Sequence, residues 1–175
     1  MDIIRMEGGL GNQLFQYALY CQLQSMGRTV KMDVTTEYGR EHDRKHMLWA
    51  LNAVYEEATQ DEINRLTDGF MDLPSRIRRK ITGRRTKKYA EADSNFDPEV
   101  LKKTPAYLTG YFQSVRYFPD VADKLRRELV FSPDIYKDIP EALADKIREY
   151  KSRIEQAESV ALHVRRGDYL ENPKI

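Results

Sequence analysis

Residues 3–13 read Ile-Ile-Arg-Met-Glu-Gly-Gly-Leu-Gly-Asn-Gln, and this stretch predicts the fold class. The apolar run Ile3–Met6 predicts a short buried strand. Three glycines follow, and apolar residues then recur at helical spacing until Gly27, a typical helix stop. Thr29–Val34 predicts a second strand. A strand, a glycine loop, a helix and a strand in this order favour two parallel strands joined by a right-handed crossover, as in a Rossmann-like α/β sheet with flanking helices.

The glycine loop also predicts a binding site for an anionic or strongly polar ligand. Glycines before a helix N-terminus leave backbone N–H groups available, and the helix dipole adds partial positive charge there. The side-chain amides of Asn12 and Gln13 can donate and accept hydrogen bonds. We therefore expect Gly9, Gly11 and Asn12 to contact the ligand.

A second motif, His163-Val164-Arg165-Arg166-Gly167-Asp168-Tyr169, follows an apolar run near the other end of the sequence. Arginine presents a planar fork that binds phosphate oxygens bidentately and stays charged at any working pH. Glycine lets the backbone approach a ligand closely. Arg165, Arg166 and Gly167 are therefore predicted to bind a diphosphate. An edge strand with solvated arginines would be the better explanation if the pair stood alone.

A dinucleotide-binding site is the competing interpretation of the glycine loop. Residues 9–14 match the dinucleotide fingerprint except that Leu14 replaces its third glycine, and Asp33 lies about where an acidic residue would bind a ribose. A leucine at the third glycine position would push the helix away from the strand. The NAD-binding half of a dehydrogenase is therefore the second hypothesis, and a non-catalytic fragment that binds a sugar or a nucleotide is the third.

Residues 107–118 are rich in aromatic side chains, and strand alternation would place Tyr107, Thr109 and Tyr111 on one face. Aromatic rings in strands more often pack in the core than bind ligands. A glycine within the segment permits close approach, however, and Gln113 can hydrogen-bond a sugar hydroxyl. Tyr111 and Gln113 are therefore candidate acceptor contacts.

Two helices and a strand are predicted after this segment. The first helix follows Pro119 and the second follows Pro140, because proline is favoured in a first helical turn. Their apolar faces are Phe118, Ala122, Leu125 and Leu129, then Leu143, Ile147, Tyr150 and Ile154. The strand is predicted over Val160–Val164, after the second helix.

Residues 76–88 carry eight basic side chains and no acidic one. A solvated excursion is the usual explanation of such a run. The alternative is peripheral contact with an anionic membrane, where each nearby Lys or Arg contributes about 1 kcal/mol. Nucleic acid is not an expected partner, because no aromatic residue interleaves with the basic ones and the formal net charge of the chain is only +1.

Composition favours a cytoplasmic globular protein. The single cysteine, Cys21, excludes an intramolecular disulfide and is predicted to lie in or near the core. The sequence shows no signal peptide and no apolar stretch of membrane-spanning length, so we expect a cytoplasmic location or a peripheral one at the inner face of the membrane. No metal site is expected, because His42 and His46 have no third ligand nearby.

Three segments together resemble the bacterial alpha-1,2-fucosyltransferase family, glycosyltransferase family 11. The run Gly8–Ala18 matches the family's Gly-Gly-Leu-Gly-Asn-Gln-Phe/Leu-Phe-Gln-Tyr-Ala opening without a break. Leu108–Phe118 is similar to its Gly-Tyr-aromatic-Gln-Ser-x-x-Tyr-Phe segment, and His163–Tyr169 matches its His-x-Arg-Arg-Gly-Asp-Tyr motif. The motifs occur in the family's order, which makes the resemblance specific.

The resemblance implies a two-domain GT-B type enzyme that transfers fucose from GDP-fucose to the 2-hydroxyl of a galactose, with inversion and without a required metal or other cofactor. Arg165 and Arg166 would bind the donor diphosphate, and Asn12 would also reach the donor. The general base is unassigned, with Asp168, Glu7 and His163 as candidates.

Family members continue through a second Rossmann-like domain, and the resemblance implies that the strand predicted over Val160–Val164 starts it. Residues 1–157 would then form the first domain, and residues 158–175 would belong to the second. The chain is therefore expected to be a truncated N-terminal half that is inactive alone.

Overall fold

The computed structural model describes residues 1–35, 46–93, 95–137 and 139–162. The chain divides into two compact units, Met1–Ser132 and Pro133–Ile175. Each unit is described by itself. The domain boundary predicted at residues 157 and 158 stays a prediction.

A four-stranded parallel sheet with the strand order β2-β1-β4-β3 forms the centre of the first unit. Its strands are β1 (Asp2–Arg5), β2 (Val30–Asp33), β3 (Lys88–Ala90) and β4 (Tyr107–Thr109). In the register, Ile3 lies opposite Lys31 of β2 and Tyr107 of β4. The predicted α/β class, both opening strands and their parallel pairing are confirmed.

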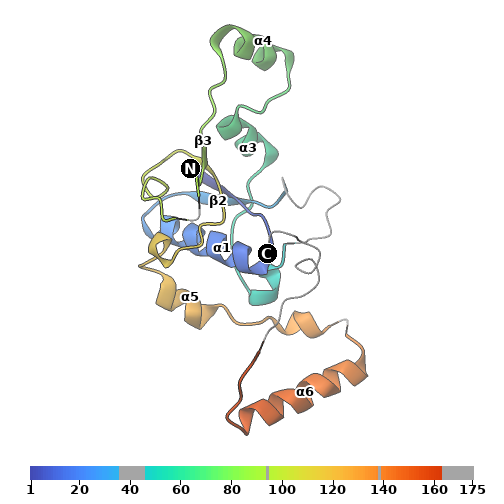
Figure 1. Cartoon of the computed structure of the whole chain (residues 1–175). Helices are drawn as coiled ribbons and strands as arrows, with labels where there is room; N and C mark the ends of the chain where they lie inside the picture. Colours follow the sequence, from blue (N-terminus) through green and yellow to red (C-terminus); the bar gives the residue numbers. More distant parts are fainter. Residues whose placement is uncertain (36–45, 94, 138, 163–175) are drawn as a thin grey trace, which may run out of the picture. The chain divides into compact units, whose positions relative to one another are not determined.

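Helix α1 (Leu10–Ser25) makes the crossover between β1 and β2 and packs on one face of the sheet (Figure 1). It buries Ala18, Leu19 and Leu23, and Gly27 ends the turn with a φ of +80°, as predicted. Met26 is 47% exposed, so the apolar face ends one turn earlier than its spacing suggested. Half-buried Cys21 packs at the edge of this core, which confirms its predicted place.

The opposite face of the sheet is covered by α3 (Gln60–Thr67), which begins with a capping box between Thr59 and Glu62. Alternation along the strands sends Ile3 and Tyr107 to this face, where they pack with Ala58, Ile63 and Leu66. Their neighbours Ile4 and Leu108 point to the α1 side. Burying one such aliphatic side chain contributes about 1.5–3 kcal/mol, so this two-sided burial is the main stabilisation of a sheet of short strands.

The remaining elements of the first unit are η1 (Leu48–Leu51), α4 (Leu73–Thr82), η2 (Val115–Tyr117) and α5 (Ala122–Glu128). The predicted apolar face of α5 is confirmed, since Phe118 and Leu125 are buried. The helix begins at Ala122, however, so Pro119 lies before its N-terminus and not in its first turn.

The second unit contains η3 (Pro133–Tyr136) and α6 (Glu141–Glu155), which follows Pro140 as predicted. No residue of α6 is buried. Of the strand predicted over Val160–Val164, the described residues 160–162 form none, and Val160 is 95% exposed. That prediction is wrong for these residues: a strand needs a neighbour for its backbone hydrogen bonds, and the described part of the second unit contains no strand that could pair with them.

No helix within the described ranges is both long enough and apolar enough to cross a membrane.

Candidate functional site

Loops after three strands meet at the carboxyl edge of the sheet, where ligands of open α/β sheets usually bind. The loop after β1 contributes Glu7, the loop after β3 contributes Glu91 and Asp93, and the loop after β4 contributes the rest. They enclose a space of about 300 Å³, which we call the polar hollow, lined by Glu7, Glu91, Asp93, Gly110, Tyr111 and Gln113.

The glycine loop supplies close packing at one position and open space at two others. Gly8 has a φ of +78°, and a Cβ there would lie 2.5 Å from the Asn12 Nδ2 atom and 3.1 Å from the Tyr111 Cε1 atom. A Cβ on Gly9 or Gly11 would meet nothing within 4 Å. No described part of the chain therefore requires glycine at these two positions. Because Gly9 and Gly11 have no side chains, a ligand can approach the first-turn N–H groups of α1 closely. Those N–H groups have no acceptor within the helix.

A hydrogen bond at Asn12 connects the glycine loop to the segment Leu108–Phe118. The Gln113 Nε2 atom donates to the Asn12 Oδ1 atom at 2.6 Å, across 101 positions of sequence. The ring of Tyr111 lies beside Gly8 and is 45% exposed. The structure thus brings together Asn12, Tyr111 and Gln113, which sequence analysis had selected from separate segments.

Two buried glutamines of α1 hold these loops in place. The Gln13 Nε2 atom donates to the Gly8 carbonyl at 2.9 Å, and its Oε1 atom accepts from the Met47 N–H at 2.7 Å. Gln16 accepts from the Glu7 N–H at 3.0 Å and donates to the Gly110 carbonyl at 2.9 Å. The Gln13 amide therefore positions the glycine loop. The sequence position of Gln13 suggested that its amide could hydrogen-bond a ligand, but in the structure both ends of the amide bind the protein itself.

Glu91 is a central residue of the site that sequence analysis missed. Its Oε2 atom accepts from the N–H groups of Tyr111 at 3.0 Å and Phe112 at 2.9 Å, and its Oε1 atom accepts from the Tyr117 hydroxyl at 3.1 Å. Burial, reinforced by the neighbouring Glu91 carboxylate, raises the pKa of Tyr117 to about 12, so the phenol stays a donor. No local sequence signal marks Glu91, since its partners lie at least 20 residues away.

The turn that Glu91 fixes also overturns the predicted alternation of the aromatic segment. β4 ends at Thr109, and buried Phe112 takes a left-handed φ of +53°. Tyr107 is 2% exposed and lies in the core, as most strand aromatics do, whereas Tyr111 lies in the loop beyond the strand. The two tyrosines therefore do not share a strand face, because the strand stops between them.

Of the three predicted general-base candidates, only Glu7 lies within the described residues. Glu7 lines the polar hollow, its side chain is 19% exposed, and its Oε2 atom lies 3.2 Å from the Arg5 Nε atom. His163, Arg165, Arg166, Gly167 and Asp168 all lie outside the described residues. Their roles in diphosphate binding and proton transfer stay predictions.

Asp33 is not available to a ribose, which removes the main support for a dehydrogenase. It is completely buried, and its carboxylate accepts from the Tyr107 hydroxyl at 2.6 Å. It also accepts from the backbone N–H of Thr35 at 2.9 Å. The Asp33 carboxylate therefore holds the residues just after β2 and the side chain of Tyr107 on β4.

Histidines do not form a metal centre in the described part of the chain. His46 lies 3.3 Å from the Tyr55 hydroxyl through its Nδ1 atom, and His42 lies outside the described residues. Among the described residues, no cluster of three or more His, Cys, Asp or Glu side chains is arranged to hold a metal ion.

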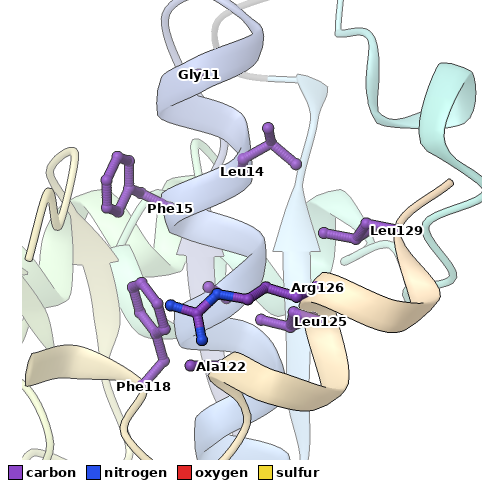
Figure 2. A pocket seen from close by; sticks show the side chains of 9 residues that line it. Gly11, Leu14, Phe15, Phe118, Ala122, Leu125, Arg126 and Leu129 are labelled. Atoms are coloured by element: carbon purple, nitrogen blue, oxygen red, sulfur yellow. The ribbon is translucent and has the colours of Figure 1, made fainter. Parts of the chain in front are cut away.

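A second, apolar groove of about 390 Å³ lies between α1 and α5 (Figure 2). Phe15 and Phe118 stand side by side in it, with ring centroids 6.0 Å apart, and the Arg126 side chain reaches toward them. It is otherwise lined by Gly11, Leu14, Ala18, Ala122, Leu125 and Leu129. Such a lining offers few partners to a sugar or a diphosphate, which makes the polar hollow the better candidate site.

Comparison with known proteins gives consistent relatives. The sequence model of Glycosyl transferase family 11 matches residues 2–175. The chain is 30% identical to an alpha-1,2-colitosyltransferase of Escherichia coli, over 97% of this chain and 56% of that protein. It is 27% identical to the O-antigen biosynthesis glycosyltransferase WbnK of Escherichia coli, over 96% of this chain and 59% of that protein. The chain thus spans somewhat more than half the length of these curated relatives. No solved structure matches it.

Proposed function

This chain belongs to glycosyltransferase family 11, and we propose that it is part of a galactoside alpha-1,2-fucosyltransferase. It would transfer fucose from GDP-fucose, with inversion, to the 2-hydroxyl of a galactose in a surface glycan. The family implies a nucleotide-sugar donor and a glycan acceptor. The three segments that resemble alpha-1,2-fucosyltransferases support the finer assignment.

The open N-terminus of α1 is the observation that carries this proposal. Negative charge builds on GDP as it leaves, and positioned backbone donors and cations stabilise such charge. The first-turn N–H groups at Gly11 and Asn12, flanked by glycines with no described neighbour at the Cβ position, supply donors of this kind. Arg165, Arg166 and Gly167 would supply the remaining contacts to the diphosphate. We propose no metal requirement, because the two guanidiniums would provide the positive charge.

The polar hollow suits the acceptor. The half-exposed ring of Tyr111 offers an apolar surface to a sugar face, and the Gln113 amide offers hydrogen bonds to sugar hydroxyls. Glu7 lines the same space and is therefore our first candidate for the base that takes the proton of the 2-hydroxyl, ahead of Asp168 and His163.

The architecture we propose is the N-terminal half of a GT-B enzyme. The parallel sheet would be its first Rossmann-like domain, and the donor domain would begin near residue 158 and include the arginine motif. The enzyme would act in the cytoplasm, with peripheral contact at the inner face of the membrane through residues 76–88.

Gly11→Ala tests the donor site. The new methyl group meets nothing within 4 Å in the protein, and alanine is the better helix former by about 0.8–1.0 kcal/mol. We therefore expect an unchanged or raised melting temperature together with GDP affinity lowered at least about tenfold, or about 1.4 kcal/mol. Ser25→Ala at the other end of α1 is the matched control and should leave affinity unchanged. Equal GDP affinity in Gly11→Ala and the unsubstituted protein would contradict the proposed donor position.

The sugar specificity has its own assay. A full-length version of the protein, which includes the proposed donor domain, is supplied with GDP-fucose or the corresponding colitose donor and a β-galactoside, and the linkage of the product is determined by NMR. Fucose in an alpha-1,2 linkage is the expected product. Preferential transfer of colitose would reassign the donor to that of the colitosyl relative, and NAD binding without GDP binding would favour a dehydrogenase.

A further inference from the structure

Helix α4 is labelled in Figure 1. Its apolar side chains form a row that is exposed to solvent. Leu73, Ile77 and Ile81 follow one another at intervals of four and therefore lie within about 80° of the helix circumference. They are 66%, 50% and 76% exposed, and Met71 just before the helix is 77% exposed. No residue of α4 is buried. An exposed apolar row of this length is costly in water and is typical of a surface that binds something.

The basic residues of the helix divide into two groups. The guanidinium of Arg78 pairs with Asp68, and Arg79 donates to the carbonyls of Asp68 at 3.1 Å and Phe70 at 2.6 Å. The Asp68 carboxylate also accepts from the Arg85 N–H at 2.9 Å. These contacts tie both ends of the excursion to the end of α3. Two of its arginines are thus used to fix the direction in which the helix faces.

The second group borders the apolar row. Helical geometry places Arg76 and Lys80 along one edge of the line formed by Leu73, Ile77 and Ile81. No described residue forms an ion pair with either side chain.

Residues 76–88 have eight basic side chains and no acidic one. Two acidic residues precede them: Asp68 pairs with Arg78, and Asp72 caps the helix by accepting from the Ser75 N–H. The net charge around Ile77 and Ile81 is therefore positive.

We propose that α4 docks this protein on an anionic lipid bilayer. Met71, Leu73, Ile77 and Ile81 would enter the interface between headgroups and acyl chains, and Arg76 and Lys80 would contact the negative headgroups. We call these six residues the α4 face. Charge complementarity favours a bilayer over a second copy of this chain, because two α4 faces would bring like charges together.

The position of α4 in the chain agrees with this role. The excursion enters the sheet at Lys88, the amino end of β3, whereas the polar hollow forms at the carboxyl ends of the strands. Docking through α4 therefore leaves the proposed acceptor site uncovered. This proposal rests on the peripheral membrane contact included in the proposed function and names the residues that would make that contact, but it does not depend on the transfer reaction.

Helix α6 provides an internal control for exposed apolar surface. Its Tyr150 and Ile154, also four residues apart, are 57% and 59% exposed. Its fifteen residues, Glu141–Glu155, contain four acidic and four basic side chains, however, so the helix has no net charge. If exposed apolar residues alone caused vesicle binding, substitutions on both helices would weaken it equally.

The experiment measures sedimentation of the purified protein with vesicles, without donor or acceptor. Vesicles of phosphatidylethanolamine with one-third phosphatidylglycerol are compared with pure phosphatidylcholine at low and at high salt. We expect binding to the anionic vesicles only, and weakening by salt. Ile77→Ser with Ile81→Ser should abolish binding, whereas Tyr150→Ser with Ile154→Ser should not. Arg76→Gln with Lys80→Gln should weaken binding about twenty-fivefold, at about fivefold for each charge, and Lys146→Gln with Lys151→Gln should weaken it much less.

Other occupants of the α4 face give different results. Equal binding to both vesicle types, or equal effects of the α4 and α6 variants, would overturn the proposal. A concentration-dependent dimer that Ile77→Ser with Ile81→Ser dissociates would identify a second copy as the partner. A marked fall in melting temperature in that variant, without a change in vesicle binding, would show that further polypeptide of this protein covers the face. GDP affinity is measured on the same variants and should be unchanged, so failure here is distinct from failure of the proposed transfer.

Discussion

Replacing Glu91 by glutamine should loosen the turn that carries Tyr111 and Gln113, two residues of the polar hollow. The carboxylate accepts three hydrogen bonds, two from backbone N–H groups and one from the Tyr117 hydroxyl. Glutamine has a single acceptor oxygen, so the three donors cannot all keep their partner. Phe112 and Tyr117 are both completely buried, and there an unsatisfied donor is costly.

The expected loss of stability is moderate. Hydrogen bonds to a charged group contribute about 1.5–3 kcal/mol each, and the glutamine retains part of this set. We therefore expect Glu91→Gln to cost about 2–3 kcal/mol and to lower the melting temperature by about 4–12 °C in a chain of this size. The left-handed turn at Phe112 would relax, because the two N–H bonds that hold it there would weaken.

The assay separates a positioning role from simple destabilisation. In a full-length version of the protein, at a temperature well below melting, Glu91→Gln should raise the KM for the acceptor several-fold, because Tyr111 and Gln113 belong to the turn that Glu91 holds, while GDP affinity stays within about twofold. Glu99→Gln, which removes an exposed carboxylate paired with Lys102, is the control and should change neither quantity. An unaltered melting temperature and acceptor KM in Glu91→Gln would refute the reasoning.

Three further predictions follow from the same structure. Asn12→Asp should melt normally yet bind GDP at least about tenfold more weakly, because it sets a carboxylate beside the proposed diphosphate, and normal GDP binding in this variant would return Asn12 to a structural role. In a full-length version of the protein, Arg166→Lys should raise the barrier to fucosyl transfer by about 2–4 kcal/mol, since lysine keeps the charge but loses the planar fork, and near-normal turnover of both Arg165→Lys and Arg166→Lys would show that the motif is structural. The N–H of Arg85, followed by the charge of Arg78, holds the pKa of Asp68 below its ordinary value, so the ionised carboxylate stabilises the α4 excursion at neutral pH and this contribution is lost as the pH falls below about 4. The protection of residues 68–88 against hydrogen exchange, expressed relative to the intrinsic exchange rate at each pH, should fall in that range, and Asp68→Asn should show low protection at every pH and no acid-dependent step.

Sequence alone determined the elements whose signal is local. The apolar run Ile3–Met6, the helical spacing that follows and the stop at Gly27 each depend on residues within one or two turns of one another, so the parallel opening of the sheet could be predicted. The spacing of Leu143 to Ile154 likewise predicted α6. Prediction from local sequence failed at Val160, where the apolar residues favoured a strand but the described part of the second unit contains no strand to pair with it.

Tertiary structure alone decided which polar side chains meet. Sequence selected Asn12 and Gln113 separately, and their contact exists because β4 lies beside β1, which places the loops after both strands at one edge. The same strand order lets Gln16 bridge Glu7 and Gly110, and pairing of β3 with β4 brings Glu91 to the turn at Phe112. A side-chain hydrogen bond depends on distances within about 3 Å, and strand order sets those distances between residues 20 to 100 positions apart. The periodicity of apolar residues along the sequence does not predict the order of the strands in the sheet.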